Sequence, residues 1–246
     1  MTGQPTARAP LDTAMVFAAG LGTRMRPITN TLPKPLVKIG GKTMLDHMLD
    51  RLDAGGVTRA IVNVHHLPDQ IETQLKGRTK PQIIVSDERD KLLDQGGGIK
   101  KVLPLIGDTD FYICNTDAVW VEGPQSAIAA MRDAWRPDEM DVLLLVAATS
   151  GSVGVDWPGD FHMAPDGRLT KRGEREVSAF VYAGVGVIKA SLFRDVQDDV
   201  FRLAPYFFRA AEAGRLFGLR LNGQWLHVGT PEAIDEAERA YARPAA

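Results

Sequence analysis

The sequence predicts an α/β fold in which a mostly parallel, mixed β-sheet is covered by helices on both faces, in three layers. Short apolar segments alternate with amphipathic helical segments from residue 14 to residue 147, as repeated strand-helix-strand units do. The first apolar run ends abruptly at Gly20, as a strand buried on both faces would. With 44% hydrophobic and 24% charged residues in a chain of 246, the composition is that of a compact globular protein.

The first half of the chain supplies the alternating elements. Its helical segments carry apolar residues on one face, and glycines at 55–56 and at 77 end two of them, because glycine readily terminates a helix. The strands are the short apolar runs between these helices. In order we expect a strand at 14–19, a helix at 43–54, a strand at 60–64, a helix at 68–75, a strand at 82–85, a helix at 98–105, a strand at 111–114, a helix at 126–135 and a strand at 142–147.

The second half has a different texture, with dense Gly, Pro and Asp between residues 151 and 173. The last helix is expected to begin at Pro231, because proline suits the first helical turn and Thr230 before it can cap the helix. The expected elements are a strand at 180–188, helices at 190–196 and 204–213, strands at 216–221 and 225–230, and the final helix at 231–241.

The domain organisation predicted from these patterns is simple. Residues 1–12, where prolines stand among small polar residues, read as a flexible arm. Residues 13–246 form one domain with two lobes, at 13–122 and 123–246.

Charge and cysteine content exclude several classes of function. The 29 basic and 31 acidic residues give a net charge of −2, so no global basic field favours nucleic acid or an anionic membrane. No apolar stretch approaches the roughly 20 residues of a membrane span, and the N-terminus lacks a signal-peptide core. The single cysteine, Cys114, excludes an internal disulfide and fits a reducing compartment, so we expect a cytoplasmic protein. We expect either a monomer or a small homo-oligomer.

The segment after the first strand carries the strongest chemical signal. Gly20 and Gly22 let the backbone approach a ligand and turn its N–H groups inward, while Arg24 and Lys34 add positive charge. A glycine pair alone would more often be an ordinary turn. Its position after the first strand of an α/β sheet, together with two basic side chains, favours a site for a polyphosphate.

Two other phosphate-binding motifs do not fit. The dinucleotide fingerprint Gly-x-Gly-x-x-Gly would need glycine where Met25 stands, and Pro27 obstructs a helix directly after it. A Walker-type loop ending at Gly41-Lys42-Thr43 would need an earlier glycine where Leu36 stands. The sequence therefore argues against both a dehydrogenase and a P-loop enzyme.

The run Ala18-Ala19-Gly20-Leu21-Gly22-Thr23-Arg24-Met25-Arg26-Pro27, followed by Lys34-Pro35, resembles the signature of sugar-1-phosphate nucleotidyltransferases. Within them, Asp94-Gln95-Gly96-Gly97-Gly98-Ile99 and Pro158-Gly159-Asp160-Phe161 are most similar to the N-acetylmuramate-1-phosphate uridylyltransferases of bacterial cell-wall recycling. The resemblance covers residues 14–241. It implies the Rossmann-like nucleotide-diphospho-sugar transferase fold and transfer of UMP from UTP to a sugar 1-phosphate.

The resemblance also implies roles for the nucleotide-binding residues. The backbone of Ala19, Gly20, Gly22 and Thr23 would wrap the triphosphate of UTP. Arg24 would stabilise the leaving pyrophosphate and Lys34 would contact the phosphates at the reacting centre. Gln95 and Gly97 would read the edge of the base, although a glycine turn that caps the next helix explains their segment as well.

Metal binding is implied at two positions. Asp117, in Asn115-Thr116-Asp117 after a strand, would hold Mg²⁺ as a catalytic ligand, and the alternative for this segment is a simple Asx turn. Members of the family usually carry Trp-x-Asp-x-Gly-Thr near the C-terminus, but this chain has His227 at the aspartate position. His227 would ligate a softer ion such as Mn²⁺, contact a phosphate directly, or leave Asp117 as the sole protein ligand.

The sugar 1-phosphate is expected to contact Asn115, Asp160 and Lys171. An exposed basic hairpin explains the segment of Lys171 equally well. Two alternatives for the whole protein stay open: a mannose- or glucose-1-phosphate nucleotidyltransferase that uses another nucleoside triphosphate, and a non-catalytic nucleotide-sugar binding protein, which the change at His227 motivates.

Overall fold

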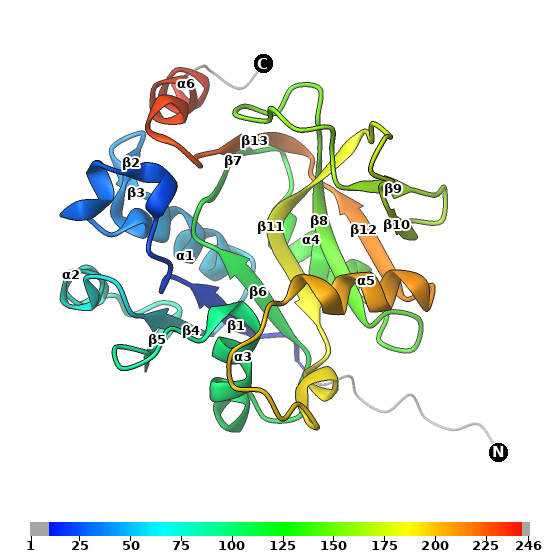
Figure 1. Cartoon of the computed structure of the whole chain (residues 1–246), viewed down its shortest axis with the longest axis horizontal. Coiled ribbons are helices and arrows are strands. Elements are labelled where there is room, and N and C mark those ends of the chain that lie inside the picture. Colours follow the sequence, from blue (N-terminus) through cyan, green and yellow to red (C-terminus); the bar gives the residue numbers. More distant parts are fainter. Residues whose placement is uncertain (1–9, 243–246) are drawn as a thin grey trace.

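The computed structural model describes residues 10–242 and confirms the α/β fold, with one mixed sheet of nine strands between two layers of helices (Figure 1). The strand order is β10-β9-β11-β6-β1-β4-β5, and β8 pairs with both β11 and β12. The strands are β1 (Thr13–Phe17), β4 (Arg59–Val64), β5 (Gln82–Asp87), β6 (Phe111–Asn115), β8 (Val142–Ala148), β9 (Phe161–Met163), β10 (Leu169–Lys171), β11 (Phe180–Ile188) and β12 (Leu216–Arg220).

Strand direction divides the sheet into parts. β6, β1, β4 and β5 are parallel to one another, and β12 is parallel to β8. β11 joins the two groups because it runs antiparallel to both β6 and β8. Since parallel strands end at the same edge, the segments that follow β1, β4, β5 and β6 meet on one side of the sheet, where ligands bind in open α/β sheets.

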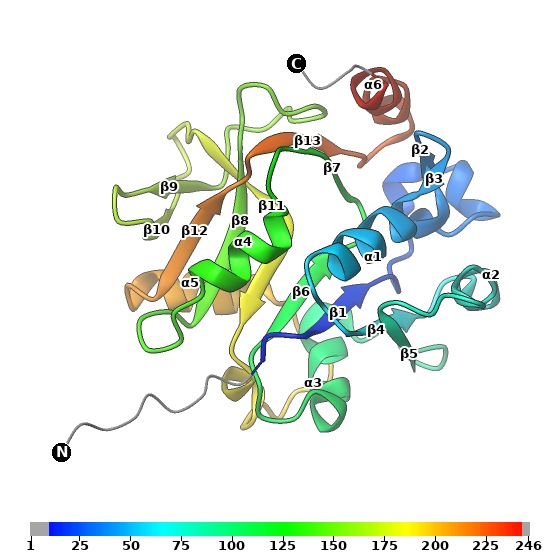
Figure 2. The same cartoon turned by 180° about the vertical axis from the view of Figure 1, so that it is seen from behind.

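Alternation along the strands produces two hydrophobic clusters, one on each face of the sheet. In β1, Ala14 and Val16 face one cluster and Met15 faces the other, as the two-residue period of a strand requires. The first cluster packs under α1 (Met44–Ala54), α2 (Pro68–Leu75) and α4 (Ala127–Ala134). Figure 2 shows α1 and α4 in front of the sheet. The second packs under α3 (Asp94–Ile106), the 3₁₀ helix η4 (Ala190–Phe193) and α5 (Ala204–Glu212).

A third, smaller cluster forms beside the main sheet. The antiparallel pair β7 (Ala118–Glu122) and β13 (Gly223–His227) packs there with α6 (Pro231–Tyr241) and the hairpin of β2 (Lys38–Ile39) and β3 (Lys42–Thr43). Figure 1 shows α6 beside this hairpin. The short helices η1 (Thr23–Met25), η2 (Ile28–Asn30) and η3 (Lys34–Leu36) connect β1 to the hairpin.

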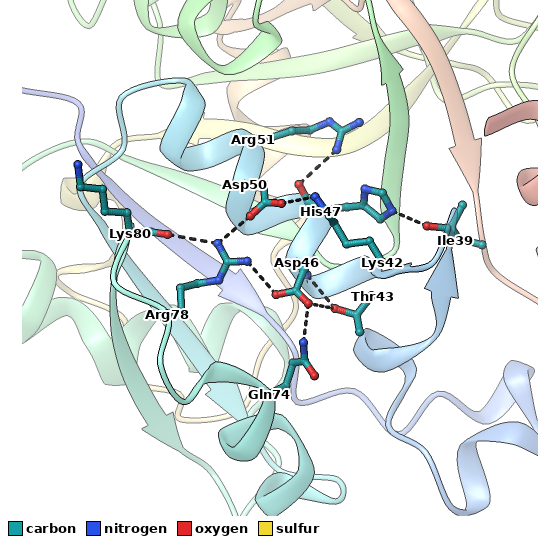
Figure 3. A network of polar contacts seen from close by, with 10 residues as sticks. All are labelled: Ile39, Lys42, Thr43, Asp46, His47, Asp50, Arg51, Gln74, Arg78 and Lys80. Atoms are coloured by element: carbon teal, nitrogen blue, oxygen red, sulfur yellow. Dashed lines mark hydrogen bonds and ion pairs between the residues drawn. The ribbon is translucent and has the colours of Figure 1, made fainter. Parts of the chain in front are cut away.

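A polar network fixes α1 against the segment that follows α2 (Figure 3). The Arg78 guanidinium donates to Asp46 and to Asp50 on α1, both at 2.8 Å. The Lys42 ammonium donates to the same Asp50 carboxylate at 2.5 Å, and Gln74 donates to Asp46. These contacts hold α1 against β3, α2 and the segment after α2.

The structure agrees with most of the predicted elements and differs at some of their ends. Helix α3 begins at Asp94, so residues 95–98 form its first turn instead of a loop. The helix expected at 190–196 is a short 3₁₀ helix. Thr230 stands at the N-cap of α6, but its side chain makes no hydrogen bond to the helix backbone. Strands β2, β3 and β7 were not expected from the sequence. β9 and β10 form a hairpin, which was the alternative given for the segment of Lys171.

The predicted arm lies mainly outside the described residues, which begin at 10. Of its last residues, Leu11 is buried, and the Asp12 carbonyl accepts hydrogen bonds from the Thr58 and Arg59 amides. The division into two lobes at residue 122 stays a prediction, since the sheet runs through both halves. Within residues 10–242, every helix is too short or too polar to cross a membrane.

Candidate active site

A cavity of about 600 Å³ lies at the carboxyl ends of the parallel strands β1, β4, β5 and β6. Its wall combines backbone from the segment after β1 with polar side chains that follow the neighbouring strands. Of the residues expected from the sequence to bind nucleotide, all but Gly97 line it: Ala19, Gly20, Gly22, Thr23, Arg24, Lys34 and Gln95. Asn115, expected to contact the sugar, and Asp117, expected to hold the metal, line it as well.

The segment after β1 is shaped by Gly22. This residue has a φ of 61°, in the left-handed region that favours glycine, and a Cβ there would lie 2.8 Å from the Thr29 methyl carbon. The Thr29 hydroxyl donates to the Gly22 carbonyl at 2.8 Å and so holds the turn. By contrast, nothing lies within 4 Å of the position that a Gly20 Cβ would occupy. The loop therefore has one tightly packed glycine and one that faces open space.

Lys34 and Asp117 form the central ion pair of the cavity. The Lys34 Nζ donates to the Asp117 Oδ2 at 2.7 Å, and the two side chains are 14% and 24% exposed. The turn that carries Asp117 is fixed to β1 because the Thr116 hydroxyl donates to the Phe17 carbonyl at 3.0 Å. The pair joins residues that are 83 positions apart in the sequence.

The electrostatics of this pair keep the carboxylate charged. Burial opposes ionisation of Asp117, but the positive charge and hydrogen bond of Lys34, with contributions from His227 and Arg24, hold the pKa of Asp117 below its usual value. Burial lowers the pKa of His227, and Lys34 and Arg24 act in the same direction against the opposing effect of Asp117. The surroundings of His227 therefore favour its neutral imidazole, which is the form that can ligate a metal.

His227 lies behind the rim of the cavity. Its ring packs edge-on against Trp157, with centroids 5.2 Å apart, and lies tilted against the Trp225 ring, with centroids 5.3 Å apart. A Cβ at Gly229, which lines the cavity, would lie 2.5 Å from the His227 Nε2. The ring is thus part of an aromatic cluster whose edge reaches the cavity wall.

Gln95 and Asn115 meet across the cavity. The Gln95 Nε2 donates to the Asn115 Oδ1 at 2.8 Å, which links the first turn of α3 to the end of β6. Both side chains line the cavity and keep further donor and acceptor groups there. They can form hydrogen bonds to a ligand on either side.

Gly96 and Gly97 pack closely against the segment at 197–201. The Cβ of Gly97 would collide with the Asp199 carbonyl oxygen, and that of Gly96 would collide with the Phe201 ring. The Gly96 amide donates to the Phe201 carbonyl at 2.9 Å. These glycines therefore allow residues 197–201 to pack on the start of α3, and Val200 of that segment lines the cavity.

A buried polar pair that was not expected from the sequence also lines the cavity. Asn63, at the end of β4, and Glu88, just after β5, are 3% and 2% exposed, and both line the cavity. The Asn63 Nδ2 donates to the Glu88 Oε1 at 2.8 Å. A polar residue inside the apolar run at 60–64 was the available signal, because a buried amide requires a partner.

Asp160 and Lys171 do not line the cavity. The Asp160 carboxylate accepts from the Trp157 indole at 3.1 Å and from the Tyr182 amide at 2.9 Å. The Lys171 ammonium lies 4.4 Å from the centre of the Phe208 ring. Lys171 belongs to the β9–β10 hairpin, and the side chains of both residues contact protein groups outside the cavity lining.

The residues present suit a hard divalent ion that takes one ligand from the protein and others from a substrate and water. Within residues 10–242, His, Cys, Asp and Glu side chains nowhere gather in a group of three that could hold a metal. A carboxylate kept ionised in a polar cavity nevertheless fits Mg²⁺, which retains water and substrate oxygens as ligands. Asp117 supplies that carboxylate, and it shares the group with Lys34.

Comparisons with known proteins agree with this geometry. Residues 13–150 match the Nucleotidyl transferase family model. The chain is 43% identical over 233 residues to the N-acetylmuramate alpha-1-phosphate uridylyltransferase of Caulobacter vibrioides, covering 93% of this chain and 96% of the relative. It is 30% identical over 228 residues to the protein of the same name from Neisseria meningitidis serogroup B, covering 92% of this chain and 96% of that relative.

A solved structure shares the fold. UDP-glucose pyrophosphorylase complexed with UDP-glucose superimposes with a TM-score of 0.76 over 94% of this chain and 98% of that chain, at 16% sequence identity. The chain therefore belongs to the nucleotidyl transferase family and is a nucleotidyltransferase of the nucleotide-diphospho-sugar transferase fold.

Proposed function

We propose that this enzyme transfers UMP from UTP to N-acetylmuramate 1-phosphate, giving a UDP-sugar and pyrophosphate. The carrying observation is the cavity at the carboxyl ends of the parallel strands, where a glycine loop, a Lys34–Asp117 ion pair and a Gln95–Asn115 amide pair face one space. The names of the two bacterial relatives support uridylyl transfer and this sugar. Catalysis of this kind would support cell-wall recycling in the cytoplasm.

The nucleotide is proposed to span the cavity. The backbone of residues 19–23 and the Arg24 side chain take the triphosphate, because N–H groups and a guanidinium both suit phosphate oxygens. Gln95 takes the edge of the uracil, whose carbonyl and N–H groups complement a carboxamide. Gly97 contributes to this subsite by letting residues 197–201 support the start of α3.

The chemistry needs alignment more than activation. An oxygen of the sugar phosphate is already an anion, and it attacks the α-phosphorus in line, forming one P–O bond while the bond to the β-phosphate breaks. Both electrons of the broken bond leave with pyrophosphate. Lys34 and Arg24 stabilise the charge that accumulates on the phosphates, which is the largest contribution a protein can make to such a step.

A divalent ion, Mg²⁺ in our proposal, would be held by Asp117 and supplies charge neutralisation on the phosphates. His227 is the second proposed ligand, since its neutral ring lies close enough to Asp117 for each to affect the other's pKa. An imidazole favours Mn²⁺ over Mg²⁺ more than a carboxylate does. Asn115 is the proposed sugar contact within the cavity, and Asp160 and Lys171 are proposed contacts from the neighbouring strands.

The test is pyrophosphate release by the purified protein. UTP, GTP, CTP and dTTP are each combined with N-acetylmuramate, mannose and glucose 1-phosphates, with Mg²⁺ or Mn²⁺. The highest kcat/KM is expected for UTP with N-acetylmuramate 1-phosphate. A preference for another nucleotide or sugar would identify a sister enzyme. Absence of turnover in every combination, with binding of UTP retained, would indicate a nucleotide-sugar binding protein.

A further inference from the structure

A chain of hydrogen bonds through Asn63 and Glu88 connects the two ends of the nucleotide site. At one end, the Ala18 amide, at the start of the phosphate-binding segment, donates to the Asn63 Oδ1 at 2.8 Å. Asn63 in turn donates to the Glu88 Oε1 at 2.8 Å. At the other end, the Leu93 amide, directly before α3, donates to the Glu88 Oε2 at 3.4 Å.

On the side away from the cavity, the pair packs closely against α3. A Cβ on Gly98, in the first turns of α3, would lie 3.0 Å from the Glu88 Oε1 and 3.1 Å from the Asn63 Nδ2. The backbone of Glu88 is fixed as well, because its amide donates to the Val64 carbonyl at 2.8 Å. The helix that carries Gln95 therefore rests directly on the same two side chains that hold the Ala18 amide.

A buried carboxyl group is an expensive way to fill space. Burial raises the pKa of Glu88, so the environment disfavours its charged form, whereas an apolar side chain would incur no such penalty. An unmade hydrogen bond at either end would leave a buried backbone amide or side-chain group without a partner. The group is therefore explained by its hydrogen bonds.

Resting on the proposed function, we infer that Asn63 and Glu88 are positioning residues that set the spacing between the phosphate subsite and the base subsite. Neither needs to touch the nucleotide. They fix the Ala18 amide and the start of α3 relative to each other, so that one nucleotide can engage both subsites. A rigid spacing lets the base and the triphosphate bind as one ligand without a further ordering cost.

Exchange of the amide and the carboxylate between positions 63 and 88 tests the inference, because it reverses the direction of the hydrogen bond between the two side chains. In Asn63→Asp, two carboxyl groups face each other, and UTP affinity is expected to fall at least about tenfold, as for a lost buried hydrogen bond. Glu88→Gln keeps the bond from Asn63 but turns an amide donor towards Leu93, so a smaller loss is expected. The double variant Asn63→Asp/Glu88→Gln restores every donor and acceptor and the original net charge, and it is expected to recover wild-type affinity.

A fragment comparison separates spacing from local damage. Asn63→Leu removes the pair without adding charge and fills a similar volume. By calorimetry with Mg²⁺ present, it is expected to bind uridine and tripolyphosphate as the wild type does while losing at least about tenfold in affinity for UTP. The matched control is Ser86→Ala, which changes a buried side chain on β5 outside the cavity lining.

The outcomes are distinct. A double variant as weak as Asn63→Asp, wild-type UTP affinity in Asn63→Leu, or equal losses for UTP and both fragments would each overturn the inference while leaving the proposed function intact. If Asn63→Asp does not fold, the Asn63→Leu comparison decides. If the wild-type protein itself binds no UTP, the proposed function fails and this inference fails with it.

Discussion

Removal of the Lys34 ammonium gives the sharpest test of the proposed chemistry. In the structure this group lies 2.7 Å from the Asp117 carboxylate, in a cavity where the two side chains are only 14% and 24% exposed. Lys34→Ala deletes one positioned positive charge near the phosphates that react. Loss of one such preorganised stabilising group typically costs about 10²–10³ in kcat, or roughly 3–4 kcal/mol of transition-state stabilisation.

The assay is steady-state pyrophosphate release at saturating UTP and sugar 1-phosphate. The matched control is Lys38→Ala, because Lys38 is an exposed lysine on β2 that does not line the cavity. The control is expected to keep the wild-type kcat. Thermal unfolding of Lys34→Ala should shift only modestly, since a lost partly buried hydrogen bond to a charged group is worth about 1.5–3 kcal/mol.

A cycle with Asp117→Ala extends this test. Because Lys34 and Asp117 contact each other, the two losses in kcat should be non-additive, and the double variant should be little slower than the worse single variant. A wild-type kcat in Lys34→Ala would refute the assigned role. The role would also be refuted if the fall in kcat were fully explained by loss of folded protein at the assay temperature.

Three further changes have defined outcomes. His227→Asp should increase the ratio of the rate with Mg²⁺ to that with Mn²⁺, and an unchanged ratio would remove this residue from the metal site. Gly97→Ala should reduce the free energy of unfolding by about 1–3 kcal/mol, because the new Cβ would meet backbone atoms, and so lower the midpoint of thermal unfolding. Gly20→Ala should leave the midpoint unchanged, because nothing lies near its Cβ position. Asp50→Asn should cost at most about 1 kcal/mol near pH 7 in denaturant unfolding, since the pair with Arg78 is partly exposed. Burial opposes ionisation of Asp50, but hydrogen bonds to Lys42 and Arg78 lower its pKa in the folded protein. Its contribution to the free energy of unfolding is therefore present above the ordinary pKa of an aspartate. The difference in stability between Asp50→Asn and the wild type should vanish as the pH falls through the folded-state pKa.

The sequence identified the fold because the strong signals were local. The buried run of β1 and the loop after it are contiguous, and the basic residues Arg24 and Lys34 follow within a few turns. The pairing of β7 with β13 was not predictable in the same way. Its partners are about a hundred residues apart, and the strand pairs Trp120 with Trp225 outside the main sheet. Non-local pairing leaves little trace in one strand's own sequence.

The start of α3 was missed for a related reason. Three consecutive glycines, at 96–98, disfavour a helix by their intrinsic propensity, so the sequence indicated a loop. Tertiary packing outweighs this preference, because only glycine leaves room for the backbone near Asp199 and the ring of Phe201. Asn63 and Glu88 were overlooked because 25 positions separate them, and only the parallel register of β4 and β5 brings them together.

Residues 197–201 pack the C-terminal half of the chain against helix α3 of the N-terminal half. They come from the half beyond β8, yet they seal the glycine face of α3, and the Lys100 ammonium donates to the Gln197 and Asp198 carbonyls there. In a hybrid enzyme that joins the N-terminal half of one relative to the C-terminal half of another, these two packed segments would come from different proteins and would fit poorly. Residues 197–201 and the glycines at 96–98 must therefore come from the same relative if the start of α3 is to pack as it does here.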